Sequence, residues 1–279
     1  MLRSVYKPHH INATAEDLAG NKGIGRYIFL PGSDGRAKEI AEHFDNTVVK
    51  PHPRGHHLYL GTLRTEGKKI EVAAISSGMG CASMEIILHE LFNLEAKRFL
   101  RVGTAGTLQP NIVPIGSLIN VQASVRDEGT TRHYAPIELP AIASLEFITS
   151  ILVAAEKLGL ADTVYTGIVH CKGSLYARQL AAGPQAPQNQ NYLNLLTQSG
   201  VLATEMETAA LFIQSQLYNY QLMQEGERPE HHVLAGGILA IIGSTDHIED
   251  SKETHEAIHD SIDLALETVK ILAIQELLS

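Results

Sequence analysis

Short apolar runs alternate along this chain with segments whose apolar residues recur at helical spacing. Several of the runs are rich in β-branched or aromatic residues and lead into a glycine turn: 27–30 before Pro31-Gly32, 72–75 before Gly78, and 99–102 before Gly103. Runs of this kind are typical of buried strands that end in tight turns. The first hundred residues are therefore predicted to supply three strands.

The segments that follow the first two turns have one apolar face each. After the first turn this face holds Ala37, Ile40, Ala41 and Phe44, and after the second it holds Met84, Ile87, Leu88 and Leu91. Both patterns fit an α-helix. A strand, a glycine turn and a helix in repeated order predict an α/β fold with three layers, α/β/α, around a central, mostly parallel mixed sheet.

The remainder of the chain continues the pattern. We expect strands at 116–125, 164–170 and 233–242, and helices at 144–158 and 205–218, with an amphipathic helix closing the C-terminal end. The stretch 183–191, GPQAPQNQN, is rich in proline, glycine and amides and is predicted to be a loop or lid. Neither a repeat nor a linker interrupts the pattern, so 1–279 is predicted to form a single domain.

Composition and charge narrow the class of protein. With 44% hydrophobic and 19% charged residues the chain has the composition of a globular protein. A net charge of −9 disfavours nucleic acid and anionic membranes as general partners, because both require a basic surface. Residues 1–12 do not resemble a signal peptide, and no apolar run is long enough for a membrane span. The chain has two cysteines, Cys81 and Cys171. We therefore expect a cytoplasmic protein whose cysteines are small buried residues.

An acidic protein that binds an anion must do so locally, which draws attention to two arginines beside the glycine turns. Arg36 lies four residues after Gly32, and Arg101 lies two residues before Gly103. In an α/β sheet the carboxyl ends of strands and the helix N-termini after them bind anions. Guanidinium groups match phosphate oxygens in bidentate geometry, and Thr104 adds a hydroxyl donor. Either arginine alone fits a solvated charge equally well, but the two together predict a phosphate site.

The segment 203–210 places Glu205 and Glu207 on either side of Met206 at a strand-to-helix junction. Acids in the first turn of a helix commonly interact with the helix dipole. The alternative is that a carboxylate accepts hydrogen bonds from sugar hydroxyls while the methionine forms an apolar wall. The sequence leaves both interpretations open.

The sequence lacks the motifs of several other kinds of active site. None of the glycine turns fits the dinucleotide fingerprint or the Walker P-loop. The 14 histidines include no HExxH pair and have no cysteine partners at zinc-binding spacing, so no metal site is predicted. A G-x-S-x-G nucleophile elbow is also missing.

Four segments together carry a resemblance to a known family: Leu30-Pro31-Gly32 with Arg36-Ala37-Lys38, Ser77-Gly78-Met79-Gly80, Leu100-Arg101-Val102-Gly103-Thr104-Ala105-Gly106, and Glu205-Met206-Glu207. In their order and spacing the chain resembles the uridine phosphorylase and hexameric purine nucleoside phosphorylase superfamily over nearly its whole length. The resemblance implies attack by inorganic phosphate on a nucleoside, giving a free base and ribose 1-phosphate. Phosphate is then a co-substrate and no cofactor is expected.

The resemblance also implies roles for individual residues. Phosphate is expected to be bound by Gly32, Arg36, Arg101 and Thr104, and ribose by Glu205, Met206 and Glu207. Arg54 is expected to reach the phosphate of a neighbouring subunit. His10, in an N-terminal arm spanning 1–22, is expected to contact the ribose 5′-hydroxyl across the same interface. The family works as dimers commonly arranged as a hexamer, so a homohexamer with shared sites is expected.

The base remains the open question. The stretches 123–129, 133–136 and 171–176 look like uridine phosphorylases, and Gln179 matches the glutamine that holds uracil in the better-known branch. The arginine two positions later is replaced by Ala181, for which Lys172 is expected to compensate as a donor. In contrast, 245–248 is similar to the purine branch, in which Asp246 would be the catalytic acid for the leaving base, although it fits a loop cap equally well. We favour uridine, with a purine nucleoside as the alternative.

Two rival functions remain. A nucleosidase of the same fold uses water, which needs a general base rather than a group of arginines. A catalytically silent nucleoside-binding protein is the rival of another class, because fold does not determine function.

Overall fold

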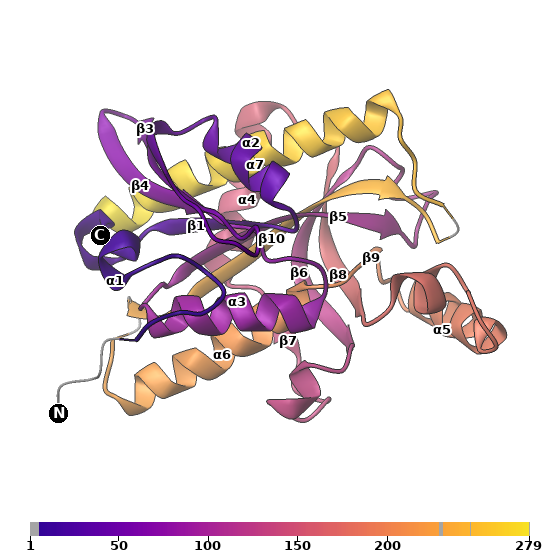
Figure 1. The fold of residues 1–279 in the computed structure, drawn as a ribbon. Coiled ribbons are helices and arrows are strands. Elements are labelled where there is room, and N and C mark those ends of the chain that lie inside the picture. Colours follow the sequence, from indigo (N-terminus) through magenta and orange to yellow (C-terminus); the bar gives the residue numbers. More distant parts are fainter. Residues whose placement is uncertain (1–5, 229–230, 246, 279) are drawn as a thin grey trace.

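The computed structural model describes residues 6–228, 231–245 and 247–278, and its central feature is a sheet of ten strands with helices on both faces (Figure 1). The strands are β1 Tyr27–Pro31, β2 Asp45–Lys50, β3 Leu58–Thr65, β4 Lys68–Ala74, β5 Arg98–Thr107, β6 Leu118–Asp127, β7 Ala141–Ile142, β8 Val164–Lys172, β9 Ala203–Glu205 and β10 Leu234–Gly243. Every strand predicted from the sequence is present.

The sheet is mixed, as predicted. Its order is β10-β6-β8-β9-β5-β1-β4-β3-β2, with β7 beside β6. Strands β4, β1, β5 and β10 run parallel, as do β6, β8 and β9, whereas β2, β3 and β4 form antiparallel pairs. Because β10 pairs with both β5 and β6, and β9 with both β5 and β8, part of the sheet closes on itself. The closure brings the carboxyl ends of β8 and β9 close to those of β5 and β10.

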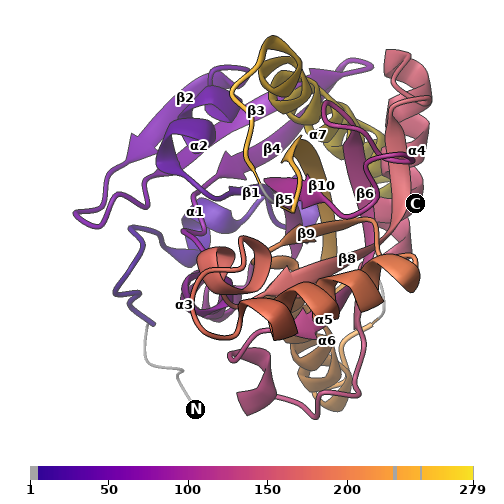
Figure 2. The ribbon, with the colours of Figure 1, turned by 90° about the vertical axis from the view of Figure 1, so that its right-hand side faces the viewer.

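The helices form two layers. They are α1 Ala15–Leu18, α2 Asp34–Ala41, α3 Cys81–Asn93, α4 Leu145–Leu158, α5 Ala186–Gln198, α6 Thr208–Gln224 and α7 Lys252–Leu278, with short turns η1 Asn21–Gly23, η2 Thr131–His133 and the π-helical η3 Leu175–Gln179. Helices α2, α4 and α7 cover one face and α3 and α6 the other, while α5 stands apart beyond β9 (Figures 1 and 2). The predicted three-layer α/β/α architecture is therefore confirmed.

Each layer has its own apolar core. The predicted faces of α2 and α3 are buried throughout: Ala37, Ile40, Ala41, Phe44, Met84, Ile87, Leu88 and Leu91. The first four pack on β1, β3 and β4 and belong to the same core as residues of α4 and α7, and the last four belong to the core that α3 shares with α6. The helical spacing of these residues therefore predicted the packing correctly.

Gly78 forms the turn that leads from β4 toward α3. Its φ is +72°, and a Cβ added there would lie 2.1 Å from Ser83 Oγ. L-residues rarely adopt this conformation. A glycine is therefore required here by both the backbone and the space.

Three element predictions were wrong. The glycine turn expected at Gly103 is not a turn, because β5 continues without a break from Arg98 to Thr107. Most of the expected loop or lid at 183–191 belongs to α5, because Pro187 stands in the first turn, where its missing N–H is tolerated, and Leu193 and Leu196 pack against Leu108. The helix expected from residue 205 begins at Thr208, since residues 203–205 pair as β9.

Both cysteines are buried free thiols, as expected, with Cys81 Sγ 3.5 Å from Cys171 Sγ. Among the described helices, none combines the length and the apolar character needed to cross a membrane.

Candidate active site

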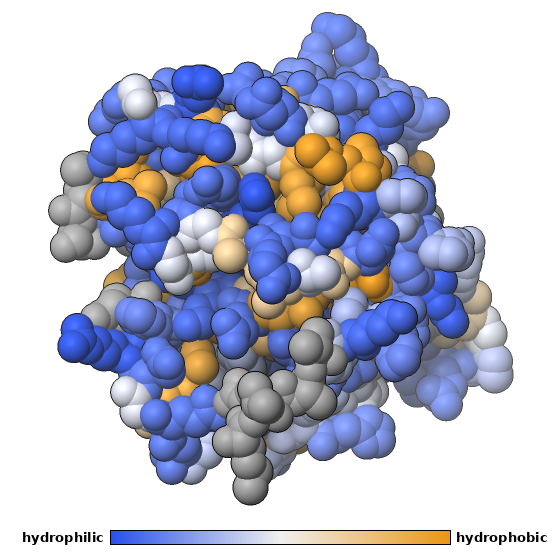
Figure 3. Space-filling model, turned by 60° about the vertical axis from the view of Figure 1, so that its left-hand side comes forward, coloured by the Kyte–Doolittle hydropathy of each residue, from blue (hydrophilic) through white to orange (hydrophobic). Residues whose placement is uncertain are grey.

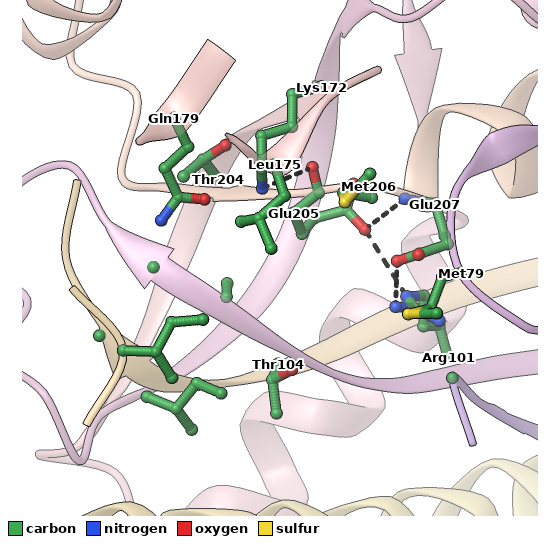
Figure 4. Close-up of a pocket in the computed structure, with 16 residues that line it drawn as sticks. Met79, Arg101, Thr104, Lys172, Leu175, Gln179, Thr204, Glu205, Met206 and Glu207 are labelled. Carbon is green, nitrogen blue, oxygen red and sulfur yellow. Dashed lines mark hydrogen bonds and ion pairs between the residues drawn. The ribbon is translucent and has the colours of Figure 1, made fainter. Parts of the chain in front are cut away.

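A cavity of about 200 Å³ lies where several strands end (Figure 4). Its wall comes from the turn after β1, the turn after β4, β5, the end of β8, η3, the junction of β9 with α6, and the end of β10. The lining residues are Gly32, Met79, Arg101, Thr104, Ala105, Gly106, Lys172, Leu175, Gln179, Thr204, Glu205, Met206, Glu207, Ile242, Gly243 and Ile248. This is the place where ligands bind in α/β sheets.

Eight of the residues predicted from the sequence meet in this wall: Gly32, Arg101, Thr104, Lys172, Gln179, Glu205, Met206 and Glu207. Arg36, Arg54 and His10 do not line it. Asp246, the predicted catalytic acid, lies outside the described residues.

Arg101 and Glu207 are paired at one end of the cavity (Figure 4). Arg101 Nη2 donates to Glu207 Oε2, and the Gly80 N–H donates to Glu207 Oε1 at 2.5 Å. Arg101 Nη1 also donates to Ser77 Oγ at 3.3 Å. Both side chains are almost completely buried. The carboxylate is therefore held by donors from β5 and from the turn before α3.

Burial raises the pKa of Glu207 above its usual value, and the positive charge of Arg101 opposes this effect. A carboxylate in this setting accepts hydrogen bonds strongly, because little water competes for its oxygens. Glu207 is thus suited to bind hydroxyl groups of a ligand.

Glu205 is held within the protein itself. Its Oε2 accepts the Glu207 N–H at 2.7 Å, and its Oε1 accepts the N–H and the hydroxyl of Thr208 at 3.0 and 2.5 Å. Arg101 Nε lies 3.6 Å from Glu205 Oε2. The carboxylate caps the start of α6 and supports Arg101, and a direct contact with ribose stays a prediction.

The other end of the cavity carries Lys172 and Gln179. Lys172 is 3% exposed, and its Nζ donates to the carbonyl oxygen of Glu205 at 3.3 Å. Burial lowers the pKa of Lys172. The Gln179 amide donates to the carbonyl oxygen of Ser244 at 2.7 Å. Leu175 and Ile242 add apolar wall, so this end suits a flat, partly polar ring.

Arg36 lies near Arg101, although it is not part of the wall. Burial lowers the pKa of Arg36, and the charge of Arg101 lowers it further. The two guanidinium groups form a region beside Gly32 that offers several N–H donors to an anion, although Arg101 already pairs with Glu207. Such a region attracts an anion.

Arg54 and His10 lie elsewhere on the chain. Arg54 is exposed between β2 and β3. His10 Nδ1 is 2.7 Å from Glu90 Oε1, and the Glu90 carboxylate also accepts the backbone N–H groups of residues 9–11. The predicted contacts of both residues with a neighbouring subunit stay predictions.

The sequence did not single out Met79, Leu175, Thr204 and Ile248 as wall residues. Each of them lies inside, or directly beside, a segment that the sequence analysis had singled out. Closeness to these segments was the one feature of the sequence that could have identified them. Within the described ranges, no three His, Cys, Asp or Glu side chains are grouped to hold a metal ion.

The guanidinium group of Arg101, the buried carboxylate of Glu207 and a polar end with apolar walls lie in one cavity, an arrangement suited to an anion together with a hydroxylated ligand. The model of the Phosphorylase superfamily matches residues 26–279, so the chain belongs to this superfamily. This confirms the resemblance seen in the sequence.

Similar proteins include several uridine phosphorylases. The chain is 32% identical to the uridine phosphorylase of Treponema pallidum over 278 residues, which cover 96% of this chain and 95% of the relative. It is 32% identical to that of Escherichia coli over 206 residues, 72% of this chain and 77% of the relative. A crystal structure of uridine phosphorylase from Vibrio fischeri superposes with a TM-score of 0.76 at 25% identity, covering 96% of this chain and 99% of the other.

Proposed function

We propose that this protein catalyses the phosphorolysis of uridine. An oxygen of inorganic phosphate bonds to C1′ of the ribose while the bond from C1′ to N1 of uracil breaks, and the electron pair of that bond leaves with the base. The products are ribose 1-phosphate and uracil, which takes up a proton. The observation that carries the proposal is the union in one cavity of Arg101, Glu207 and the Lys172–Gln179 end. The similar uridine phosphorylases support it.

Phosphate would bind between the turn at Gly32 and the side chains of Arg36, Arg101 and Thr104. The N-terminus of α2 adds its dipole to the two guanidinium charges. Since Arg101 also contacts Glu207, the same side chain would set the position of the phosphate relative to the ribose.

Ribose would lie against Met206, with its 2′- and 3′-hydroxyls donating to Glu207. This places C1′ between the phosphate and the base as positive charge develops on the sugar. Holding two reactants in line lowers a barrier by roughly 7–11 kcal/mol in favourable model reactions. A covalent enzyme intermediate is not required.

Uracil would occupy the end formed by Lys172 and Gln179. The amide of Gln179 pairs with the polar edge of the ring, and Lys172 donates to a ring carbonyl. Negative charge gathers on the carbonyl oxygens as the base leaves, so a buried cation favours the transition state. A role for Asp246 as the catalytic acid would apply to a purine base.

We further propose a cytoplasmic homohexamer built from dimers that acts in nucleoside salvage. Its dimers would share sites, with Arg54 and His10 contributing to the neighbouring cavity. Hydrophobic areas lie among hydrophilic side chains on the face shown in Figure 3, and burial of such areas between subunits would stabilise an assembly. The two neighbouring free thiols are consistent with a reducing compartment.

The decisive experiment is an assay of base release from uridine, thymidine, inosine and adenosine, each with and without phosphate. We expect uracil and ribose 1-phosphate in equal amounts, and only when phosphate is present. Base release without phosphate would identify a nucleosidase, and release from purine nucleosides alone would identify a purine phosphorylase. Binding of uridine without release of any base would identify the silent binding protein.

A further inference from the structure

A cluster of ionic groups outside the cavity is centred on Asp127, the last residue of β6. Asp127 Oδ2 lies 2.7 Å from Arg178 Nε and 2.9 Å from His170 Nε2, and Asp127 Oδ1 accepts from Arg178 Nη2 at 3.0 Å. Arg178 therefore binds the carboxylate through two nitrogens, the strongest arrangement for this pair.

His170 ties this carboxylate to the strand beside the cavity. The ring is fully buried, and burial lowers the pKa of His170, so the imidazole is neutral. A carboxylate accepts hydrogen bonds, so the ring proton belongs on Nε2 and points to Asp127. Nδ1 then accepts from the Thr204 hydroxyl at 3.0 Å. Strands β6, β8 and β9 are thereby connected behind the wall of the cavity.

Arg178 makes further contacts to α5. Its Nη1 donates to Asn189 Oδ1 at 2.7 Å, and the Asn189 amide donates back to the Ala177 carbonyl oxygen at 2.8 Å. The guanidinium carbon lies 4.5 Å from the centre of the Tyr192 ring, within the range of a cation–π contact. One side chain thus joins η3 to β6 and to α5.

The next residue, Gln179, belongs to the cavity wall, whereas Arg178 does not. Both lie in η3, a single π-helical turn of five residues, and Ala181 just beyond has a positive φ of 52°. So short a turn has little stability of its own, because one turn forms few hydrogen bonds for the residues that it orders. Besides the hydrogen bond of its own amide to Ser244, the position of Gln179 then depends on the contacts of its neighbours.

We infer that Arg178, anchored on Asp127, is a positioning residue that holds Gln179 in place for recognition of the base. The inference rests on the proposed function for the identity of the base. It explains how Gln179, together with Lys172, can hold the base although Ala181 has no polar group to assist them.

Steady-state kinetics of Arg178→Ala, Arg178→Lys, Asp127→Asn, Gln179→Ala and the double variant Arg178→Ala/Gln179→Ala test this inference. We expect Arg178→Ala and Asp127→Asn to raise the KM for uridine about tenfold, the effect of losing one hydrogen bond of about 1.4 kcal/mol, and to leave the KM for phosphate within twofold of wild type. Arg178→Lys should restore part of the loss, since it keeps the charge but not the two-nitrogen contact.

The double variant separates positioning from general stability. If Arg178 acts through Gln179, the double variant has the same KM for uridine as Gln179→Ala alone, because nothing remains to be positioned. Arg64→Ala is the matched control, since it removes an exposed arginine that pairs with Asp45 on distant strands, and it should leave both KM values unchanged. Multiplied effects in the double variant, or an equal rise in the KM for phosphate, would overturn the inference.

Hydrogen exchange of residues 174–180 gives a readout that does not depend on turnover. We expect faster exchange in Arg178→Ala than in wild type, and wild-type exchange in Arg64→Ala. If the wild-type protein releases no uracil from uridine, the proposed function is wrong. Hydrogen exchange still tests whether Arg178 holds residues 174–180 in place. Unchanged exchange in Arg178→Ala would show that Arg178 does not hold this turn.

Discussion

Arg101 and Glu207, 106 positions apart in the sequence, form a buried ion pair at one end of the cavity. Each side chain balances the charge of the other, and either charge would be costly to bury alone. In the proposed reaction the same two groups contact different reactants, phosphate and ribose, so the pair connects the two halves of the site.

Replacing Arg101 by alanine should impair phosphate binding and stability together. We expect the KM for phosphate to rise about 10- to 100-fold, the effect of losing a charge-assisted hydrogen bond. The free energy of unfolding should fall by about 3–5 kcal/mol, because Glu207 and Glu205 lose their buried partner. Phosphate titrations and urea unfolding measure the two effects.

Arg101→Lys provides the comparison. It keeps a positive charge beside Glu207, so it should recover part of the stability while the KM for phosphate stays elevated, since an ammonium does not bind in bidentate fashion. An Arg101→Ala variant with the phosphate KM of wild type would remove Arg101 from the phosphate site.

The raised pKa of Glu207 predicts a pH dependence. Ribose hydroxyls require the ionised carboxylate as an acceptor, so kcat/KM for uridine should fall on the acid side at a pH above 4.5. Glu207→Gln should lower kcat/KM about 100-fold or more, the effect of about 2.7 kcal/mol, and its residual activity should lack this acid limb. If kcat/KM of Glu207→Gln falls at the same acid pH as that of wild type, the fall is due to another ionisable group.

Stability provides an independent measure of the same pKa. Between pH 4.5 and the raised pKa, the folded protein binds more protons at Glu207 than the unfolded chain does, so this contribution to stability is lost as the pH rises. Glutamine does not titrate. The free energy of unfolding of Glu207→Gln should therefore increase relative to wild type from pH 4.5 upward, as measured by urea unfolding at several pH values.

Lys172→Met tests the contribution of the buried cation to departure of the base. Methionine fills much of the same space without a charge, so the unfolding free energy should change little or rise. We expect kcat for uridine to fall about 10- to 100-fold, in the range of a charge-assisted hydrogen bond. Comparable kcat values for the variant and the wild type, at equal thermal stability, would exclude Lys172 from the chemical step.

Gly78→Ala should destabilise the turn that precedes α3. The positive φ alone costs an L-residue about 1–2 kcal/mol, and the new methyl group would collide with Ser83 Oγ. The double variant Gly78→Ala/Ser83→Ala removes the hydroxyl but not the backbone strain, so it should recover only part of the loss in urea unfolding. Full recovery would show that the collision alone requires glycine.

Much of this site could be predicted because its parts are local in sequence. Gly32 directly follows β1 and Arg101 lies within β5, two strands that the apolar pattern revealed, and the carboxyl ends of parallel strands meet by the rules of α/β folds. The segment 205–207 was recognised for the same reason, although the structure divides its two acids between different tasks. Glu205 caps α6, and Glu207 faces the cavity.

The sequence by itself determined the three layers, the buried helix faces and the turns at Gly32 and Gly78, since these follow from periodicity and backbone sterics within short segments. Only the tertiary structure decided that β5, β9, β8, β6 and β10 close on themselves, that Glu207 pairs with Arg101, and that Asp127 anchors Arg178. Contacts of this kind join residues from about fifty to more than 130 positions apart. Their partners are selected by packing of the whole chain, which local patterns do not encode.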